Sequence, residues 1–130
     1  MLRVKTYVAE SKINGAGMGL FSMQHIRIGQ LVWCYESSMD RMISDTELRT
    51  MRLLTQQFIR KYAYMCSIHK MWVLRMDDAR FMNHSSEPNL CNGSSSLVDI
   101  ACRDIAPGEE LTCDYYSFDA EAAKKLGAVR

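Results

Sequence analysis

The chain has 130 residues, of which 48% are hydrophobic and 24% are charged, with 16 Lys and Arg against 15 Asp and Glu. This composition excludes general disorder, and the length predicts one domain with a core of its own. The formal net charge of +1 argues against direct nucleic-acid binding, which normally needs a strongly basic surface. No apolar run approaches the ~18 residues of a membrane-spanning helix, so no membrane contact is predicted.

Alternating apolar and polar residues predict strands in the first third of the chain. The segments 3–9, 20–23 and 30–35 are rich in β-forming residues. Turns are expected between them, at 14–19 and around Gly29, because glycine allows the backbone to reverse.

The pattern changes to a helical period after residue 44. Ser44, with Glu47 three residues later, has the spacing of a capping box. Apolar residues then recur at spacings of three and four, at Leu48, Met51, Leu54, Phe58 and Tyr62. They predict one amphipathic helix over 45–62 whose apolar stripe packs in the core.

The second half of the chain contains short elements separated by turn residues. The patterns predict strands over 70–76, 97–103 and 111–116, a loop over 83–96, and a short helix between Asp119 and Gly127. Several short strands around one longer helix indicate a β-rich α+β fold, without the alternation of strands and helices that a parallel sheet requires.

The cysteines and histidines predict neither a disulfide framework nor a metal site. The cysteines are odd in number and contain no C-x-x-C pair, so reduced thiols are expected. They are Cys34, Cys66, Cys91, Cys102 and Cys113. The three histidines lack the spacing of metal ligands.

The first candidate functional segment is Asn14-Gly15-Ala16-Gly17-Met18-Gly19-Leu20-Phe21. Its alternating glycines allow unusual backbone conformations, so that a ligand can lie against the main chain. The segment leads into a predicted strand and not a helix, which disfavours a phosphate or nucleotide site. A tight structural turn explains the segment equally well.

The second candidate segment is Arg80-Phe81-Met82-Asn83-His84-Ser85-Ser86-Glu87-Pro88-Asn89. Its short polar side chains hydrogen-bond local backbone in many proteins, so a structural turn is the alternative to a binding site. So many hydrogen-bonding groups in ten residues are nonetheless unusual for a plain connection.

The third candidate segment runs from Pro107 to Tyr116. It contains the adjacent carboxylates Glu109 and Glu110, but neighbours on a strand face opposite ways, so a solvated turn is favoured for them over acid–base catalysis. By the same alternation, Tyr115 and Tyr116 are predicted to point to opposite faces.

These three segments, in this order, resemble the SET-domain family of protein lysine methyltransferases, in particular its minimal bacterial and viral members. Residues 15–21 are similar to the first cofactor motif of the family, 80–85 match R-F-x-N-H-S, and 108–115 match G-E-E-L-T-x-D-Y. The resemblance implies one SET domain over 1–130 with a β-clip-like fold of small curved sheets and a C-terminal pseudoknot. It also implies a short post-SET-like segment at 117–130.

The resemblance implies an enzyme that uses S-adenosyl-L-methionine to methylate a lysine of a basic protein, such as a histone or a histone-like protein. The implied cofactor-binding residues are Ala16, Gly17, Met18, Gly19, Arg80, Asn83, His84 and Tyr115. Tyr115 and Tyr35 are the implied catalytic residues, and Tyr35 and Cys113 are assigned to the lysine channel. A catalytically silent SET-like module that binds peptide or cofactor is the alternative.

One departure from the family bears on the product. Many members carry Phe or Tyr two residues before the final tyrosine of the third motif, where this chain has Cys113. Because a thiol is smaller than an aromatic ring, a roomier channel and di- or trimethylation are expected.

Two further features concern partners and location. The Cys-rich modules that flank many members are absent, so either residues 117–130 or a second subunit, as in a homodimer, is expected to close the lysine channel. The acidic residues between Asp99 and Glu121 could attract a lysine-rich substrate or form a solvated face. The expected location is the cytoplasm for a bacterial protein, or the nucleus if the substrate is chromatin.

Overall fold

The structure is a computed structural model that describes residues 1–93 and 95–127. In these residues, short strands form four small sheets. In sheet order, the strands are β1 (Thr6–Glu10) and β2 (Met18–Ser22); β3 (Leu31–Cys34), β9 (Val98–Ala101) and β8 (Leu90–Asn92); β4 (Arg41–Ile43), β6 (Met71–Leu74) and β5 (Tyr64–Cys66); and β10 (Thr112–Cys113) and β7 (Asn83–His84). The helical elements are α1 (Asp45–Arg49), α2 (Leu53–Tyr62), α3 (Ala122–Lys125) and the 3-10 turns η1 (Asp78–Phe81) and η2 (Tyr115–Ser117). The predicted β-rich α+β class is confirmed.

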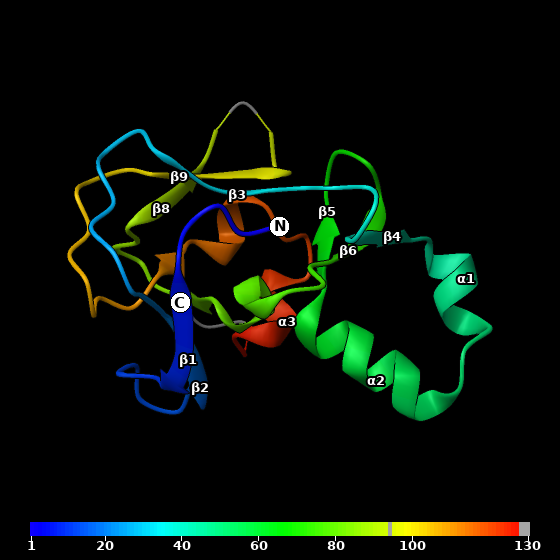
Figure 1. The fold of residues 1–130 in the computed structure, drawn as a ribbon. Helices are drawn as coiled ribbons and strands as arrows, with labels where there is room; N and C mark the ends of the chain where they lie inside the picture. Colours follow the sequence, from blue (N-terminus) through cyan, green and yellow to red (C-terminus); the bar gives the residue numbers. More distant parts are fainter. Residues whose placement is uncertain (94, 128–130) are drawn as a thin grey trace.

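The sheets share a buried core that includes residues from distant parts of the chain. Leu20, Trp33, Ile105 and Leu111 are fully buried in the larger cluster. A smaller cluster under α1 and α2 includes Leu48. Figure 1 shows β8 and β9 on one side of the molecule, whereas α1 and α2 extend on the other side.

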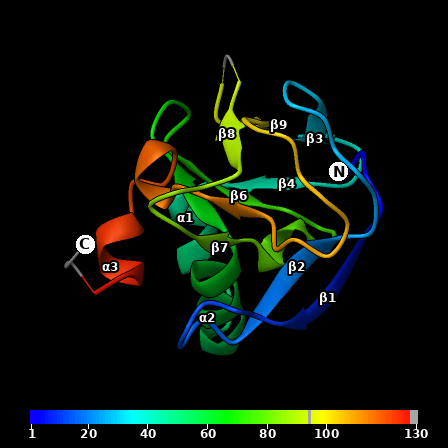
Figure 2. The ribbon, with the colours of Figure 1, turned by 90° about the vertical axis from the view of Figure 1, so that its left-hand side faces the viewer.

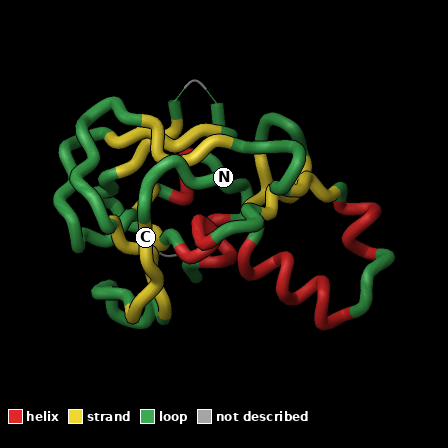
Figure 3. Tube along the Cα trace, in the orientation of Figure 1, coloured by secondary structure: helices red, strands yellow, loops and turns green. Residues whose placement is uncertain are grey.

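The predicted helix over 45–62 is interrupted. Its start is confirmed, because the side chain of Ser44 accepts a hydrogen bond from Glu47 N at 3.0 Å. The helix ends early because the Thr50 hydroxyl donates to Glu47 O at 2.6 Å, which competes with the helical bond to that carbonyl. Arg52 is then extended, with φ −61° and ψ 149°, before α2 begins. Figure 3 shows the two helices as an angled arm beside the strands.

The interruption also changes which side chains of this region are buried. Leu54 is 78% exposed and Phe58 is 45% exposed, whereas Ile59 is 3% exposed. The predicted core stripe is therefore wrong for Leu54 and Phe58, which lie at the surface, whereas Tyr62 packs against the smaller core cluster as predicted and Ile59 is buried.

The only parallel pair among the described strands is β7 with β10, which aligns Asn83 with Thr112 and His84 with Cys113. Ser85 N extends this pairing with a hydrogen bond to Cys113 O at 3.0 Å. The C-terminal segment therefore lies against the middle of the chain, in the region where a pseudoknot was expected. The loop predicted over 83–96 was wrong in part, because it contains β7 and β8.

The strand predicted over 111–116 ends at Cys113. The Asp114 side chain accepts a hydrogen bond from Tyr116 N at 3.0 Å and turns the chain into η2. Strand alternation therefore does not apply to Tyr115 and Tyr116, and both rings lie beside His84, with centroids 5.5 and 5.6 Å away. The strand expected at these two positions is thus absent, and of the two tyrosines only Tyr115 is part of the lining of the cavities described below.

Candidate active site

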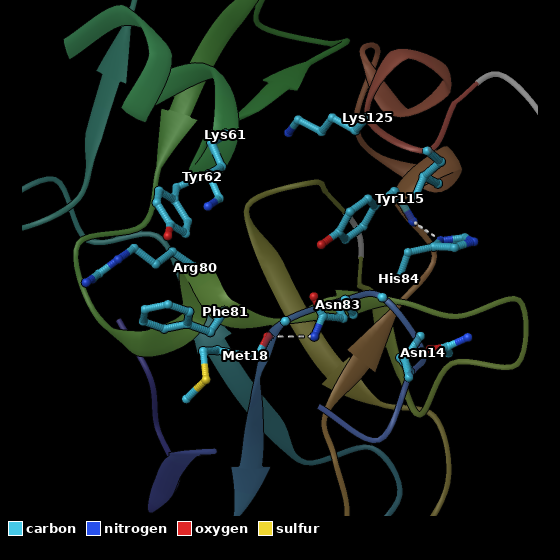
Figure 4. Close-up of a pocket in the computed structure, with 15 residues that line it drawn as sticks. Asn14, Met18, Lys61, Tyr62, Arg80, Phe81, Asn83, His84, Tyr115 and Lys125 are labelled. Carbon is cyan, nitrogen blue, oxygen red and sulfur yellow. Dashed lines mark hydrogen bonds between the residues drawn. The ribbon is translucent and has the colours of Figure 1, made fainter. Parts of the chain in front are cut away.

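A cleft of about 760 Å³ collects parts of all three sequence motifs. Its lining comes from the glycine loop (Ile13, Asn14, Gly15, Ala16, Gly17, Met18), from the middle motif (Arg80, Phe81, Asn83, His84), from Tyr115, and from the ends of α2 and α3 (Lys61, Tyr62, Lys125, and Leu126 just after α3). Figure 4 shows these side chains around the opening. Residues that are up to 113 positions apart thus form one site.

The glycine loop presents main chain to this cleft. Gly15 and Gly17 have φ of +78° and +76°, a conformation that residues with a Cβ rarely adopt. The loop is closed by a hydrogen bond from Ser11 N to Gly17 O at 2.8 Å. Ala16 and Met18, the predicted backbone contacts, therefore lie at the cleft wall.

Gly19 has a different role from the one expected. It is buried and does not line the cleft. A Cβ at this position would lie 2.5 Å from Glu110 Oε2 and 3.3 Å from Asn83 Nδ2. Gly19 is thus needed for close packing of the protein against itself, and the structure does not place it among the cofactor-facing residues.

Glu110 anchors the glycine loop, although the sequence favoured a solvated turn for it. Ser11 Oγ donates to Glu110 Oε2 at 2.7 Å, and Lys12 N donates to Oε1 at 2.9 Å. Asn83 Nδ2 adds a third bond to Oε2 at 3.2 Å. The solvated-turn prediction holds only for Glu109, which forms an exposed ion pair with Arg103 at 2.9 Å.

Asn83 and His84 are both at the cleft, and each also holds another motif in place. Asn83 Nδ2 donates to Met18 O at 2.9 Å and so ties the glycine loop to β7. His84 Nδ1 accepts from Tyr115 N at 3.1 Å, which places the proton of a neutral imidazole on Nε2. These two side chains position the loop and Tyr115 around the same opening.

Tyr115 stands where the cleft meets a second, narrower cavity of about 40 Å³. Its hydroxyl donates to Met82 O at 2.6 Å. Burial raises the pKa of Tyr115 above its usual value, so the hydroxyl stays protonated and can donate. The predicted residue thus occupies the junction of two cavities.

The inner cavity has aromatic walls that the sequence did not reveal. Tyr64 and Phe118 pack edge to face with centroids 4.9 Å apart, and Phe118 contacts Tyr115 in the same way at 5.9 Å. Cys113 also lines this cavity, and burial raises the pKa of its thiol to about 12. Cys113 thus lines the inner cavity with a neutral thiol, and its assignment to a lysine channel stays a prediction.

An ion pair is buried at the wall of the inner cavity. Arg75 Nη2 lies 3.0 Å from Asp99 Oδ2, and the two side chains are 4% and 0% exposed. The guanidinium also stacks over Trp33 at 4.3 Å and over Tyr64 at 5.1 Å. Arg75 thus fills space beside Cys113 and neutralises a carboxylate that no solvent reaches.

The C-terminal segment contributes part of the lining of the inner cavity. Phe118, Asp119 and Lys125 all line it. Lys125 Nζ pairs with Asp119 Oδ2 at 2.7 Å and also donates to Ala63 O at the end of α2. Figure 2 shows α3 at the edge of the molecule, beside α2.

Tyr35 is the one predicted site residue, besides Gly19, that lines neither cavity. Its hydroxyl donates to Asp40 O at 3.4 Å, and its ring packs against the larger core cluster. The geometry gives no support to its assignment to the lysine channel, and Tyr64 stands at that wall instead.

The acidic segment between Asp99 and Glu121 is not a free acidic face. Asp99 and Asp119 are buried in ion pairs, and Glu121 pairs with Lys124 at 2.9 Å. Asp104 accepts from Ile28 N at 2.8 Å. Several of these carboxylates therefore hold the fold together, and the attraction of a lysine-rich substrate by this segment stays a prediction.

The described residues contain neither a metal-binding cluster nor a membrane-spanning helix. No group of three or more His, Cys, Asp or Glu side chains in residues 1–93 and 95–127 is arranged to hold a metal ion. The helices in the same ranges are too short or too polar to cross a bilayer.

Comparison with known proteins places this fold and site in one family. The SET-domain family profile matches residues 17–116. Histone-lysine N-methyltransferase trithorax of Drosophila virilis is 31% identical over 134 residues, which cover 90% of this chain, and human histone-lysine N-methyltransferase 2B is 32% identical over 128 residues, which cover 85%. The chain belongs to the SET-domain family. It spans only 3% and 4% of the length of these two relatives.

Solved structures show the same fold. A structure described as ctPRC2 in an autoinhibited conformation bound to S-adenosylmethionine matches 96% of this chain and 17% of its own, with a TM-score of 0.69 and 23% identity. The Chaetomium thermophilum Polycomb Repressive Complex 2 bound to GSK126 gives a TM-score of 0.69 with 22% identity, and it also matches 96% of this chain and 17% of its own.

Proposed function

We propose that this chain is a protein-lysine N-methyltransferase that uses S-adenosyl-L-methionine. The proposal rests on one observation, which is that the cleft meets the inner cavity at Tyr115. One opening suits a cofactor and the other suits a long, narrow side chain. Membership of the SET family and the two histone-lysine methyltransferase relatives support the same reaction.

The cleft fits the proposed cofactor. Its volume of about 760 Å³ lies within the usual range for sites of drug-sized ligands, ~300–1,000 Å³. Gly15 and Gly17, with their positive φ angles, expose main chain to the cleft, and Asn83 and His84 line the same cleft beside this loop. These residues would hold the cofactor, which when bound supplies an electrophilic methyl group on a sulfonium.

The chain's own residues then prepare the lysine amine. A lysine in water has a pKa of ~10.4 and must lose its proton before it can attack. The rings of Tyr64, Tyr115 and Phe118 form one part of the wall of the inner cavity, where they would shield an entering amine from water. Desolvation lowers the pKa of an amine that enters, so proton loss needs no strong base.

Tyr115 serves in this mechanism as an orienting group. Its hydroxyl is protonated and fixed on Met82 O, so it can align an amine but cannot remove a proton near neutral pH. The rate gain would come mainly from alignment and from the fixed dipoles at the junction of the cavities.

The proposed substrate is a lysine-rich protein such as a histone or a histone-like protein, and the proposed product is di- or trimethyl-lysine. The names of the two relatives support the first proposal. The small buried thiol of Cys113 at the inner cavity supports the second. Mass spectrometry of a methylated histone tests the product: Cys113→Tyr should restrict it to monomethyl-lysine, and a wild-type product that stops at monomethyl-lysine contradicts the proposal.

Calorimetry and methyl transfer together test the reaction. Wild-type protein should bind S-adenosylmethionine, and Asn83→Ala should weaken that binding, because Met18 O loses its partner. Transfer of labelled methyl to histone should then be lost in Tyr115→Phe. Binding without transfer in the wild type would favour the alternative, a catalytically silent module that binds cofactor or peptide.

A further inference from the structure

The wall of the cofactor cleft carries positive charge without acidic side chains. Three of its lining residues are cationic, Lys61, Arg80 and Lys125, and none of those the structure describes is Asp or Glu. Such a wall attracts an anionic group on a ligand and repels a cationic one.

Two of the three cations already have polar partners. Lys125 pairs with Asp119 at 2.7 Å. Arg80 Nη1 donates to Asp77 O at 3.2 Å, and its guanidinium stacks over Phe81 at 4.8 Å. These contacts hold Lys125 to the segment before α3, and Arg80 to residues of its own 3-10 turn.

Lys61 differs from both. It lies in the last turn of α2, and its ammonium contacts the ring of Tyr62, 5.2 Å from the centroid. Within residues 1–93 and 95–127, no carboxylate lies within ion-pair distance of it. Figure 4 shows its amine directed into the opening between Tyr62 and Tyr115.

We propose that Lys61 binds the carboxylate of the methionine end of S-adenosylmethionine. This inference rests on the proposed function. The ligand has an uncharged adenosine, a sulfonium, an ammonium and a single carboxylate, so the carboxylate is its only group that can pair with a lysine. Lys61 thereby fixes the direction in which the ligand lies, with its amino-acid end toward the end of α2.

A ligand that lacks only the carboxylate provides a direct test. Calorimetry compares S-adenosylmethionine with decarboxylated S-adenosylmethionine in the wild type and in Lys61→Met. The wild type should prefer the carboxylate-bearing ligand by about tenfold, a typical effect of one charge-assisted hydrogen bond. Lys61→Met should reduce that preference to about twofold or less, and Lys61→Arg should retain most of it.

Arg60→Met is the matched control. Arg60 precedes Lys61 on the same exposed turn, loses the same charge on substitution, and stacks over Trp72 at 5.5 Å away from the cleft lining. It should leave the preference unchanged, which separates a local contact from a general loss of positive charge.

The outcomes separate this inference from the proposed function. If Lys61→Met weakens both ligands equally, or leaves the preference intact, Lys61 does not bind the carboxylate and the inference is overturned, while the proposed function stands. If wild-type protein binds neither ligand, the proposed function fails and the inference fails with it.

Discussion

Replacing Glu110 by alanine should weaken cofactor binding by removing the anchor of the glycine loop. The substitution deletes an acceptor for three donors, Ser11 Oγ, Lys12 N and Asn83 Nδ2, at 2.7, 2.9 and 3.2 Å. Hydrogen bonds to a charged group contribute roughly 1.5–3 kcal/mol each. Glu110 is only half-buried and water can solvate the freed donors, so we expect a total of about 2–3 kcal/mol.

The lost free energy of these hydrogen bonds should be seen partly in protein stability and partly in cofactor affinity. Part should lower the free energy of unfolding, and the rest should appear as the cost of ordering the loop when the cofactor binds. If half of the loss falls on binding, the dissociation constant for S-adenosylmethionine rises by about tenfold, since ~1.4 kcal/mol corresponds to a factor of ten. Calorimetry and denaturant unfolding on the same protein give both quantities.

Glu109→Ala is the control for this experiment. Glu109 is adjacent in sequence and carries the same charge, but its partner is the exposed Arg103. An exposed ion pair contributes ~0–1 kcal/mol, so stability should change little and cofactor affinity should not change. Equal affinities for Glu109→Ala and Glu110→Ala would refute the view that Glu110 orders the loop.

Three other results are expected. Gly19→Ala should lower cofactor affinity as much as Glu110→Ala does, because the new Cβ would lie 2.5 Å from Glu110 Oε2 and would push this carboxylate away. Calorimetry of the double variant Gly19→Ala/Glu110→Ala should show no additive loss of affinity. Arg75→Met should lower the free energy of unfolding by ~3–5 kcal/mol, because it leaves Asp99 buried without its partner. In urea unfolding, the double variant Arg75→Met/Asp99→Leu should recover much of that stability. Additive losses from the two substitutions would contradict the coupling. Since burial raises the pKa of Tyr115, the rate of methyl transfer should not change below pH 10 through ionisation of this hydroxyl. A change of rate below pH 10 that Tyr115 causes would refute the assignment of a neutral hydroxyl.

Local sequence signals predicted local features of the fold well. The Ser44–Glu47 cap is present, and Gly127 follows the last helix with φ of +78°. Both depend on residues within a few positions of each other, so the pattern contains all the information required. The interruption after α1 also has a local cause, the hydrogen bond of the Thr50 hydroxyl to a helix carbonyl. The spacing of apolar residues, from which the helix was predicted, contains no information about such a bond.

Features set by contacts between distant segments could not be predicted in this way. Glu110 has the sequence context of a turn, and its partners Ser11 and Lys12 lie 99 and 98 positions away. The pair Arg75–Asp99 likewise depends on how β6 and β9 are placed. Asn83, His84 and Tyr115 could be predicted from the sequence because they belong to motifs whose residue types and order are specific. Lys61 and Tyr64 lie outside any motif, and only the structure shows that they line the cavities.

The attachment of the glycine loop to Glu110 sets the order in which the site can form during synthesis. A nascent chain that has emerged from the ribosome only as far as β9 contains the glycine loop, Asn83 and His84. It still lacks the carboxylate that fixes the loop and the strand β10 that pairs with β7. The proposed cofactor site can therefore be complete only after Glu110 and β10 have been synthesised, and the onset of S-adenosylmethionine binding on stalled ribosomes should mark that point.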